Sequence, residues 1–305
     1  MLRALIKTVR PHQWVKNLFV LAPMFFHRDV FLSTPAGPAL NLLITGQAVA
    51  AMAVFCLLAG AVYTINDLAD ATADRIHPIK RFRPIARGEV TVGAARILAP
   101  ALVTVSLALG SLLSWQFAAV AMLYFAENLL YTFRFKKVAF LDVSFIAFGF
   151  VLRVVGGGVA TGVHPSGYML ACTALLALFL GFGKRRYEIE SEHADKQRAA
   201  LRHYTAKSLD VALAITGSAT AATYVAYTLD PATRAFFQSN SLWLTIPFTV
   251  FGILRFVFLA SGKGGKGLKS ESPTQEMLHD VPFVVNLVAW VAVVVAIVYR
   301  LRPSA

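Results

Sequence analysis

The fold is decided by residues 42–64, which read LLITGQAVAAMAVFCLLAGAVYT. This run holds no charged residue, and it is long enough to cross a membrane as a helix, which takes about 20 apolar residues. Similar runs recur along the 305-residue chain, which is 57% hydrophobic and 15% charged, with a mean hydropathy of +0.63. Soluble domains carry about 25% charged residues. The sequence therefore predicts an all-α, polytopic membrane protein.

A window of this length finds about nine candidate membrane-spanning helices. They lie near 14–31, 42–64, 93–114, 116–133, 139–160, 167–183, 208–228, 242–260 and 282–300. The first candidate is the least regular, because Lys16, Asn17 and His27 interrupt it. The third and fourth are almost contiguous and are predicted to form a tight hairpin. Because apolar runs recur from end to end, we expect a single transmembrane domain over residues 1–305.

Basic residues are distributed unevenly among the loops. The N-terminus and every second loop hold 22 of the 29 Lys and Arg residues. The positive-inside rule then predicts a cytoplasmic N-terminus and an external C-terminus. We attribute the net charge of +13 to loops that face anionic membrane lipids or phosphorylated substrates, and not to nucleic-acid binding. The loops after the second and sixth spans are the most charged, so chemistry is expected at the cytoplasmic face of the cytoplasmic (inner) membrane.

The second span continues into YTINDLADATADRIHPIKRFRPIARGEV, residues 63–90. Four of its polar residues recur at helical spacing and share one helix face: Asn66, Asp67, Asp70 and Asp74. Carboxylates this close need a positive partner, and carboxylate and amide oxygens suit Mg²⁺ or Mn²⁺. The alternative is a solvated helix end whose acids pair with Arg75 and Lys80.

Several basic residues follow the acids directly, among them Lys80, Arg81 and Arg83. Guanidinium and ammonium groups are the donors that phosphate and diphosphate groups require. Acids that hold a metal beside bases that hold phosphate predict a diphosphate site. An ordinary basic cytoplasmic loop is the alternative, and it explains the charge but not its position next to the acids.

The pattern Asn-Asp-x-x-Asp-x-x-x-Asp at the end of the second of nine spans resembles the first signature of the UbiA superfamily of intramembrane prenyltransferases. The resemblance covers nearly the whole chain in span number, polarity and motif placement. It implies a helical bundle around a central cavity with cytoplasmic cap helices. It also implies that the aspartates hold Mg²⁺ on a diphosphate.

The chain departs from the common pattern after the sixth span. Superfamily members that alkylate aromatic rings carry a second Asp-rich motif there, whereas this chain reads LGFGKRRYEIESEHAD over 180–195. Basic residues 184–186 stand where acids are expected, and whether Glu188 and Glu190 help to bind metal is left open. Acids at one motif and bases at the other suit two phosphorylated substrates, although a purely topological role for these bases is the alternative.

Four segments resemble the decaprenyl-phosphate phosphoribosyltransferase branch of the superfamily. They are RPHQWVKN (10–17), HPIKRFRPIARGEV (77–90), YTFRFKKVAFLDV (131–143) and FGKRRYE (182–188). That branch transfers phosphoribose from phosphoribosyl diphosphate (PRPP) to a polyprenyl phosphate. The resemblance therefore implies PRPP and a polyprenyl phosphate lipid as substrates and Mg²⁺ as the cofactor.

The resemblance and the residue chemistry together assign roles to individual residues. The predicted catalytic residues are Asp67, Asp70, Asp74 and Lys184. The three aspartates, together with Asn66, are also the predicted metal ligands. The predicted substrate-binding residues are Lys16, Asn17, Lys80, Arg81, Arg83, Tyr131, Lys137, Asp142, Arg185 and Glu188. For Lys137 and Asp142 an interhelical ion pair is an equal alternative, and Arg153 is expected to make such a pair.

Two other functions fit the sequence less well. An aromatic UbiA-type prenyltransferase, such as a 4-hydroxybenzoate polyprenyltransferase, would be expected to carry the second Asp-rich motif. A transporter or a lipid-carrier binding protein would place ionisable residues near the membrane midplane, whereas here they gather at one face. The sequence leaves open the polyprenyl chain length and whether the chain forms a homo-oligomer.

Overall fold

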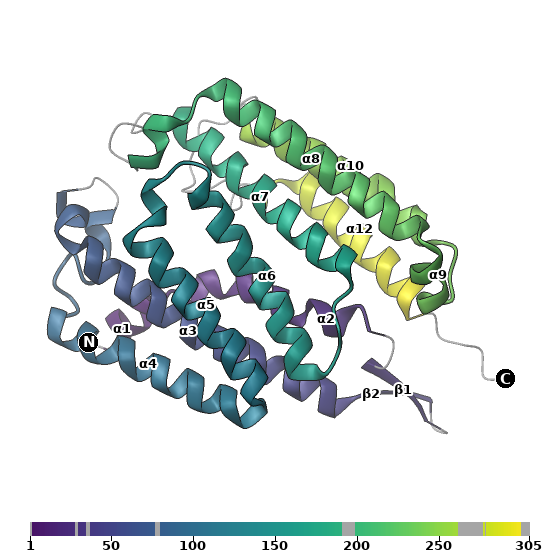
Figure 1. Cartoon of the computed structure of the whole chain (residues 1–305), viewed down its shortest axis with the longest axis horizontal. Coiled ribbons are helices and arrows are strands. Elements are labelled where there is room, and N and C mark those ends of the chain that lie inside the picture. The colour runs from purple at the N-terminus through teal and green to yellow at the C-terminus, as the bar shows by residue number, and fades with distance from the viewer. Residues whose placement is uncertain are drawn as a thin grey trace. The chain divides into compact units, whose positions relative to one another are not determined.

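The computed structural model describes residues 2–27, 30–34, 37–76, 80–190, 199–261, 277 and 279–299. Apart from one two-stranded sheet, its regular elements are helices, so the predicted all-α class is confirmed (Figure 1). The α-helices are α1 (Leu2–Val9), α2 (Ala22–Phe25), α3 (Leu42–Ile76), α4 (Val92–Leu113), α5 (Trp115–Phe133), α6 (Leu141–Thr161), α7 (Gly167–Glu190), α8 (Ala206–Leu229), α9 (Pro231–Phe237), α10 (Ile246–Ala260) and α12 (Val281–Val298). The 3-10 helices and strands are η1 (Pro11–Leu21), η3 (Lys80–Phe82), η4 (Phe135–Lys137), η6 (Ala199–His203), η7 (Leu242–Thr245), β1 (Phe31–Thr34) and β2 (Gly37–Leu40).

The chain divides into two compact units. Unit 1 comprises Met1–Val30, Leu40–Phe135 and Gly149–Pro165, and unit 2 comprises Phe31–Ala39, Lys136–Phe148 and Ser166–Ala305. The predicted acidic cluster and the basic loop after it belong to unit 1, whereas the basic residues 184–186 belong to unit 2. The expectation of a single domain over residues 1–305 stays a prediction.

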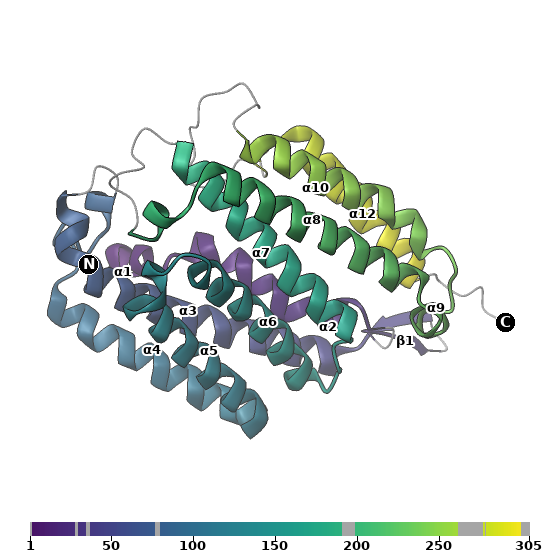
Figure 2. The ribbon, with the colours of Figure 1, turned by 45° about the horizontal axis from the view of Figure 1, so that its top comes forward.

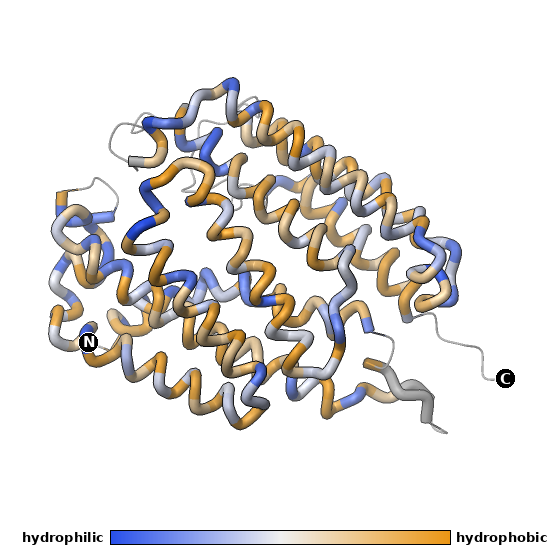
Figure 3. The backbone as a smooth tube through the Cα atoms, viewed as in Figure 1, coloured by the Kyte–Doolittle hydropathy of each residue, from blue (hydrophilic) through white to orange (hydrophobic). Residues whose placement is uncertain are grey.

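Seven of the described helical stretches are long and apolar enough to cross a membrane. They are α3, α4, α6, α7, α8, the stretch Leu242–Ala260 and α12, and they coincide with seven of the predicted spans. Figure 3 shows apolar residues along these helices and hydrophilic residues concentrated at helix ends and connections. Helix α5 has a similar length, but Gln116, Glu127 and Asn128 lower its hydropathy. The chain is a multi-pass membrane protein, whereas the count of nine spans stays a prediction.

The predicted first span, 14–31, is not one α-helix, so that part of the prediction is wrong. Residues Pro11–Leu21 form η1, which leads into the four-residue α2. Such long 3-10 runs are uncommon, and this one is held by distant partners. The Asn17 amide donates to Cys56 Sγ at 3.2 Å, and its oxygen accepts from Arg153 Nε at 2.8 Å. Hydropathy alone does not reveal these contacts.

Helix α3 positions the acidic cluster. It begins after Asn41, whose side-chain oxygen accepts from the Ile44 backbone N–H at 3.3 Å. It ends at Ile76. Its 35 residues correspond to about 52 Å, against about 30 Å for the hydrocarbon core of a bilayer. The turns that carry the acids therefore extend beyond the apolar part of the helix.

Helices α4 and α5 form the predicted tight hairpin in unit 1. Ser114 alone separates them, and its hydroxyl accepts from the Phe117 backbone N–H at 3.0 Å to begin α5. The Thr91 hydroxyl begins α4 in the same way, by accepting from the Ala94 N–H at 3.1 Å. Both starts follow from the preference for Ser and Thr at helix N-caps.

The glycines at 156–158 in α6 allow close packing in unit 1. A Cβ at Gly156 would lie 2.7 Å from the Phe55 ring. A Cβ at Gly157 would overlap the carbonyl oxygen of Val20 and lie 2.8 Å from its carbonyl carbon. Val20 belongs to η1 and is fully buried. The contact between η1 and α6 therefore requires glycine at position 157.

We expect Gly157→Ala to lower the free energy of unfolding by about 1–3 kcal/mol, because the added methyl group must displace the η1 backbone. The measurement is thermal or denaturant unfolding in detergent. Gly46→Ala in α3 is the matched control, since nothing lies within 4 Å of a Cβ there. This control should be neutral or stabilising by up to about 1 kcal/mol. Equal stabilities for the two variants would contradict the packing.

Unit 2 contains α7, α8, α10 and α12, and Figure 2 shows the last three side by side. The rings of Phe179 and Phe256 lie 4.9 Å apart in its core. Arg255 connects α10 to the start of α12 by donating to both carboxylate oxygens of Asp280, at 3.0 and 2.7 Å. These hydrogen bonds hold the pKa of Asp280 below its usual range. Asp280 also caps α12 by accepting from the Phe283 N–H at 2.9 Å.

Candidate active site

The four residues of the predicted acidic cluster lie on the last three turns of α3. Asp67 and Asp74 are buried, with exposed fractions of 1% and 3%. Asn66 and Asp70 are half-buried. The helix therefore places two carboxylates inside unit 1 and keeps two further oxygen-bearing side chains nearer its surface.

Two arginines neutralise the buried carboxylates. Arg10 Nη2 donates to Asp67 Oδ1 at 2.6 Å, and its guanidinium lies 5.1 Å from the centre of the Tyr63 ring. Arg83 Nη1 lies 3.2 Å from the same Asp67 oxygen and 2.7 Å from Asp74 Oδ2. Arg83 is among the predicted site residues, whereas Arg10 is not. The sequence feature that could have identified Arg10 is its position at the start of RPHQWVKN, a segment that resembles the phosphoribosyltransferase branch.

Apolar anchors fix the basic loop that follows α3. Ile85 and Val90 are each 2% exposed and pack with Ala95 of α4. The loop between these anchors and η3 carries Arg83 towards the acids. In η3, Lys80 is half-buried, and exposed Arg81 lies 4.9 Å from the centre of the Phe82 ring. The structure thus brings Arg83 into the acidic cluster and keeps Arg81 at the surface.

The side chains of the acidic cluster can supply only some of the ligands that a divalent cation needs. Among the described residues, no three His, Cys, Asp or Glu side chains converge on one point as a metal site. Asp67 Oδ2, however, is buried and has no hydrogen-bond partner in the described part of the chain. Mg²⁺ usually binds through one or two carboxylates, waters and substrate phosphates. The donor set fits that mode of binding.

The two neighbouring residues predicted in the N-terminal segment differ in their surroundings. Lys16 is half-buried on η1, whereas Asn17 is only 1% exposed and is bonded to Cys56 and Arg153. The buried amide favours a positioning role for Asn17 over the predicted direct contact with substrate.

Arg153 connects three elements of unit 1, but its hydrogen bonds go to neutral groups and not to the carboxylate of the expected ion pair. Besides Asn17 of η1, it donates to the Tyr124 hydroxyl of α5 at 2.7 Å and to the Gly149 carbonyl of its own helix at 2.9 Å. Its guanidinium lies 4.7 Å from the centre of the Tyr124 ring and 5.1 Å from that of Phe150. An ionisable residue in a membrane helix is costly unless it is satisfied in this way.

Unit 2 contains a buried ion-pair cluster centred on Arg185 of α7. This side chain is 1% exposed, donates from Nε to Asp142 Oδ2 at 2.7 Å, and pairs through Nη1 with Glu188 Oε2. Asp142 opens α6 and is fully buried. The geometry therefore favours positioning roles for Arg185 and Asp142 over the predicted substrate contacts, because the guanidinium and both carboxylates serve one another.

Tyr204, just after η6, extends this cluster and was not anticipated from the sequence. Its hydroxyl donates to Asp142 Oδ1 at 2.7 Å and accepts from the Phe140 N–H at 2.6 Å. Burial raises the pKa of the Tyr204 hydroxyl, and the hydrogen bond to the Asp142 carboxylate raises that pKa further. Phe140 has a φ of 66°, a left-handed conformation that is uncommon outside glycine.

Three further predicted site residues lie nearer the surface. Lys184 has a side chain 37% exposed, with Nζ 3.9 Å from Glu188 Oε1. Lys137 is exposed in η4, and Tyr131 is half-buried near the end of α5. In the basic segment of α7, Lys184 is thus far more accessible than the neighbouring Arg185.

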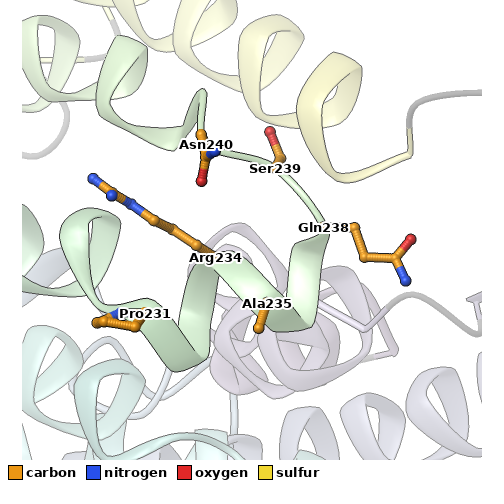
Figure 4. Close-up of a pocket in the computed structure, with 6 residues that line it drawn as sticks. All are labelled: Pro231, Arg234, Ala235, Gln238, Ser239 and Asn240. Carbon is orange, nitrogen blue, oxygen red and sulfur yellow. The ribbon is translucent and has the colours of Figure 1, made fainter.

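Two surface pockets of unit 2 lie away from the predicted site residues. One, of about 450 Å³, is formed by the connection from α9 to η7 and includes Arg234 and Asn240 (Figure 4). The other, of about 510 Å³, includes Phe140 and Lys207 near the start of α8. Because neither is lined by a predicted site residue, the candidate site rests on the side-chain clusters described above.

A bundle of apolar helices with an acidic cluster at the end of α3 is the arrangement that the sequence resemblance implies. The two arginines paired with that cluster are a finding of the structure. The chain belongs to the UbiA prenyltransferase family, whose model matches residues 20–270. A decaprenyl-phosphate phosphoribosyltransferase of Corynebacterium glutamicum is 35% identical to this chain, over 97% of this chain and 86% of that protein. One of Mycolicibacterium smegmatis is 34% identical, over 97% of this chain and 92% of that protein.

Solved structures support the fold. A UbiA homolog from Archaeoglobus fulgidus bound to GPP and Mg²⁺ matches with a TM-score of 0.69, over 97% of this chain and 99% of that one. Its sequence identity is 19%, so this likeness shows the fold alone.

Proposed function

We propose that this chain transfers 5-phosphoribose from PRPP to a polyprenyl phosphate and releases diphosphate. The observation that carries the proposal is the similarity, along 97% of the chain, to two decaprenyl-phosphate phosphoribosyltransferases at 35% and 34% identity. The charges support it: unit 1 presents Arg10 and Arg83 beside the acids, and unit 2 presents Lys184. A reaction with two phosphorylated substrates needs more cationic surface than the alkylation of a phenol.

The reaction forms one bond and breaks another at C1 of the ribose. An oxygen of the lipid phosphate attacks C1 of the ribose, and the C1–O bond to diphosphate breaks with its electron pair leaving on the diphosphate. The attacking oxygen is already anionic, so no general base is required. Positive charge develops at C1 and negative charge on the leaving group, so catalysis depends on positioning and electrostatic stabilisation.

The acidic cluster of α3 is proposed to serve the leaving group. Asp67, Asp70 and Asp74, with Asn66, are the residues that would hold Mg²⁺, supported by the buried Asp67 Oδ2 that has no hydrogen-bond partner among the described residues. When bound, the metal supplies positive charge that neutralises the diphosphate. That a UbiA homolog from Archaeoglobus fulgidus binds GPP and Mg²⁺ is in keeping with a divalent cation in this family.

The basic residues are proposed to bind the remaining phosphates. Lys80, Arg81 and Arg83 follow the acids directly and are assigned to PRPP. Lys16 and Lys184 are assigned to the lipid phosphate and the ribose 5-phosphate, and Lys137 and Tyr131 to the substrate surroundings. Because 22 of the 29 basic residues lie in the N-terminus and alternate loops, we place the site at the cytoplasmic face of the cytoplasmic membrane.

The test is a pair of reactions with the purified full-length chain and Mg²⁺. One contains radiolabelled PRPP and decaprenyl phosphate, and the other contains a prenyl diphosphate and 4-hydroxybenzoate. We expect a labelled, acid-labile lipid in the first reaction only, and its loss on addition of EDTA. Product in the second reaction alone would overturn the proposal in favour of an aromatic prenyltransferase.

A further inference from the structure

We infer that Arg10 and Arg83 are exchangeable counter-cations of the acidic cluster. They hold Asp67 and Asp74 when no metal is bound, and they transfer to diphosphate oxygens when a divalent cation takes those carboxylates. Metal and diphosphate then bind cooperatively, each weakly without the other. The inference rests on the proposed function only in that α3 serves a metal-bound diphosphate, and it does not depend on which diphosphate substrate the enzyme uses.

The first observation is how unevenly the Asp67 carboxylate is used. Oδ1 receives Arg10 Nη2 at 2.6 Å and Arg83 Nη1 at 3.2 Å. Oδ2 is buried without a hydrogen-bond partner in the described residues. A stable Arg–carboxylate pair is commonly bidentate and uses both oxygens. Both guanidiniums therefore contact one oxygen of Asp67, and the second oxygen receives no hydrogen bond from the described residues. This carboxylate can still accept a further positive partner.

The second observation is the difference in exposure between the acids and their arginines. The side chains of Asp67 and Asp74 are 1% and 5% exposed, whereas those of Arg10 and Arg83 are 21% and 23% exposed. Arg185 in unit 2 is the contrasting case, because its side chain is 1% exposed and its guanidinium pairs with two carboxylates. A guanidinium with access to solvent can move to a new anion at much lower cost than a buried one.

The third observation is the backbone of Arg10. Its φ of 53° and ψ of 64° place it in the left-handed region, between α1 and η1. This conformation costs an L-residue free energy and is found where a structure imposes it, often at functional sites. The Arg10 side chain therefore reaches Asp67 from a strained junction of the backbone.

Charge balance then favours binding of the two ligands together. Two carboxylates and two guanidiniums are neutral together. A divalent cation alone would add positive charge beside two arginines, and a diphosphate alone would add negative charge beside two buried carboxylates. Bound together, the cation pairs with the carboxylates and the arginines pair with the diphosphate. Linkage requires the two ligands to strengthen each other equally, and coupling of this kind is typically about 5- to 150-fold.

The experiment measures Mn²⁺ bound to the protein by electron paramagnetic resonance, at free Mn²⁺ concentrations fixed by a metal buffer. The full-length chain is held in lipid nanodiscs, with and without inorganic diphosphate. For the unmodified protein we expect diphosphate to tighten Mn²⁺ binding by about 10-fold or more. Without diphosphate, Arg10→Gln and Arg83→Gln should bind Mn²⁺ more tightly than the unmodified protein, because a competing cation is gone. Diphosphate should tighten Mn²⁺ binding by a smaller factor in both variants than in the unmodified protein.

Two control variants make the result specific. Arg87→Gln removes a guanidinium that pairs with the exposed Glu89, 2.9 Å away, and should leave both affinities unchanged. Arg10→Lys keeps the positive charge, so its Mn²⁺ affinity without diphosphate should stay close to that of the unmodified protein. Weaker or unchanged Mn²⁺ binding by folded Arg10→Gln and Arg83→Gln, without diphosphate, would overturn the exchange. Because the probe is inorganic diphosphate, a failed PRPP assay with the exchange intact would reject only the proposed substrate.

Discussion

Asp67→Asn should lower the rate of phosphoribosyl transfer by about 10³-fold, a loss comparable to removing one preorganised electrostatic group from an active site. The substitution keeps the shape of the side chain but removes the negative charge that we propose holds the cation on the leaving diphosphate. Asp67 is the most buried member of the cluster, with both Arg10 and Arg83 on one oxygen. The measurement is the transfer of label from PRPP to lipid at saturating Mg²⁺.

Protein stability separates this loss of activity from misfolding. Arg10 and Arg83 are each more than one-fifth exposed, so water can solvate them when the carboxylate is gone. Asp67→Asn should therefore remain folded, with only a modest shift in its thermal unfolding. Glu89→Gln, which changes an exposed acid on the same loop, should keep nearly full activity. Retention of more than about one-tenth of the activity by Asp67→Asn would contradict its assigned role.

Hydropathy and residue spacing predict the apolar helices and the shared face of the acids well, because both depend on local periodicity. The structure places Asn66, Asp67, Asp70 and Asp74 on one helix, as their spacing requires. The first span fails because its 3-10 geometry depends on distant residues. Asn17 and Arg153, which hold that segment, are 136 positions apart in the chain. A pattern among neighbouring residues cannot reveal a contact between residues so far apart in the chain.

The partners of the charged residues are also beyond local prediction. Arg10 lies 57 positions from Asp67, and Arg185 lies 43 positions from Asp142. The positive-inside rule assigns every basic residue of a loop to the same side of the membrane, but it does not separate surface cations from buried ones. The family resemblance proposes the segments, and the structure then ranks the residues within each segment by burial and contacts.

Arg185→Met should lower the free energy of unfolding by about 3–5 kcal/mol, the cost of removing one partner from a buried ion pair. The substitution leaves the Asp142 and Glu188 carboxylates, which Arg185 now neutralises, inside unit 2. Lys184→Met is the matched neighbour. Its side chain is 37% exposed and its ammonium lies 3.9 Å from Glu188 Oε1, and such exposed pairs contribute about 0–1 kcal/mol. Thermal unfolding in detergent measures both effects.

The same two variants distinguish positioning from substrate binding. If Lys184 contacts a substrate phosphate, Lys184→Met should be as stable as the unmodified protein but raise the KM for PRPP or for polyprenyl phosphate by about 10-fold, the loss of one charge-assisted hydrogen bond. If Arg185 acts through its carboxylates, its loss should appear first in stability. A stable Arg185→Met protein with a raised KM would restore Arg185 as the phosphate contact that the sequence predicts. That result would mean that the guanidinium leaves Asp142 and Glu188 when substrate binds.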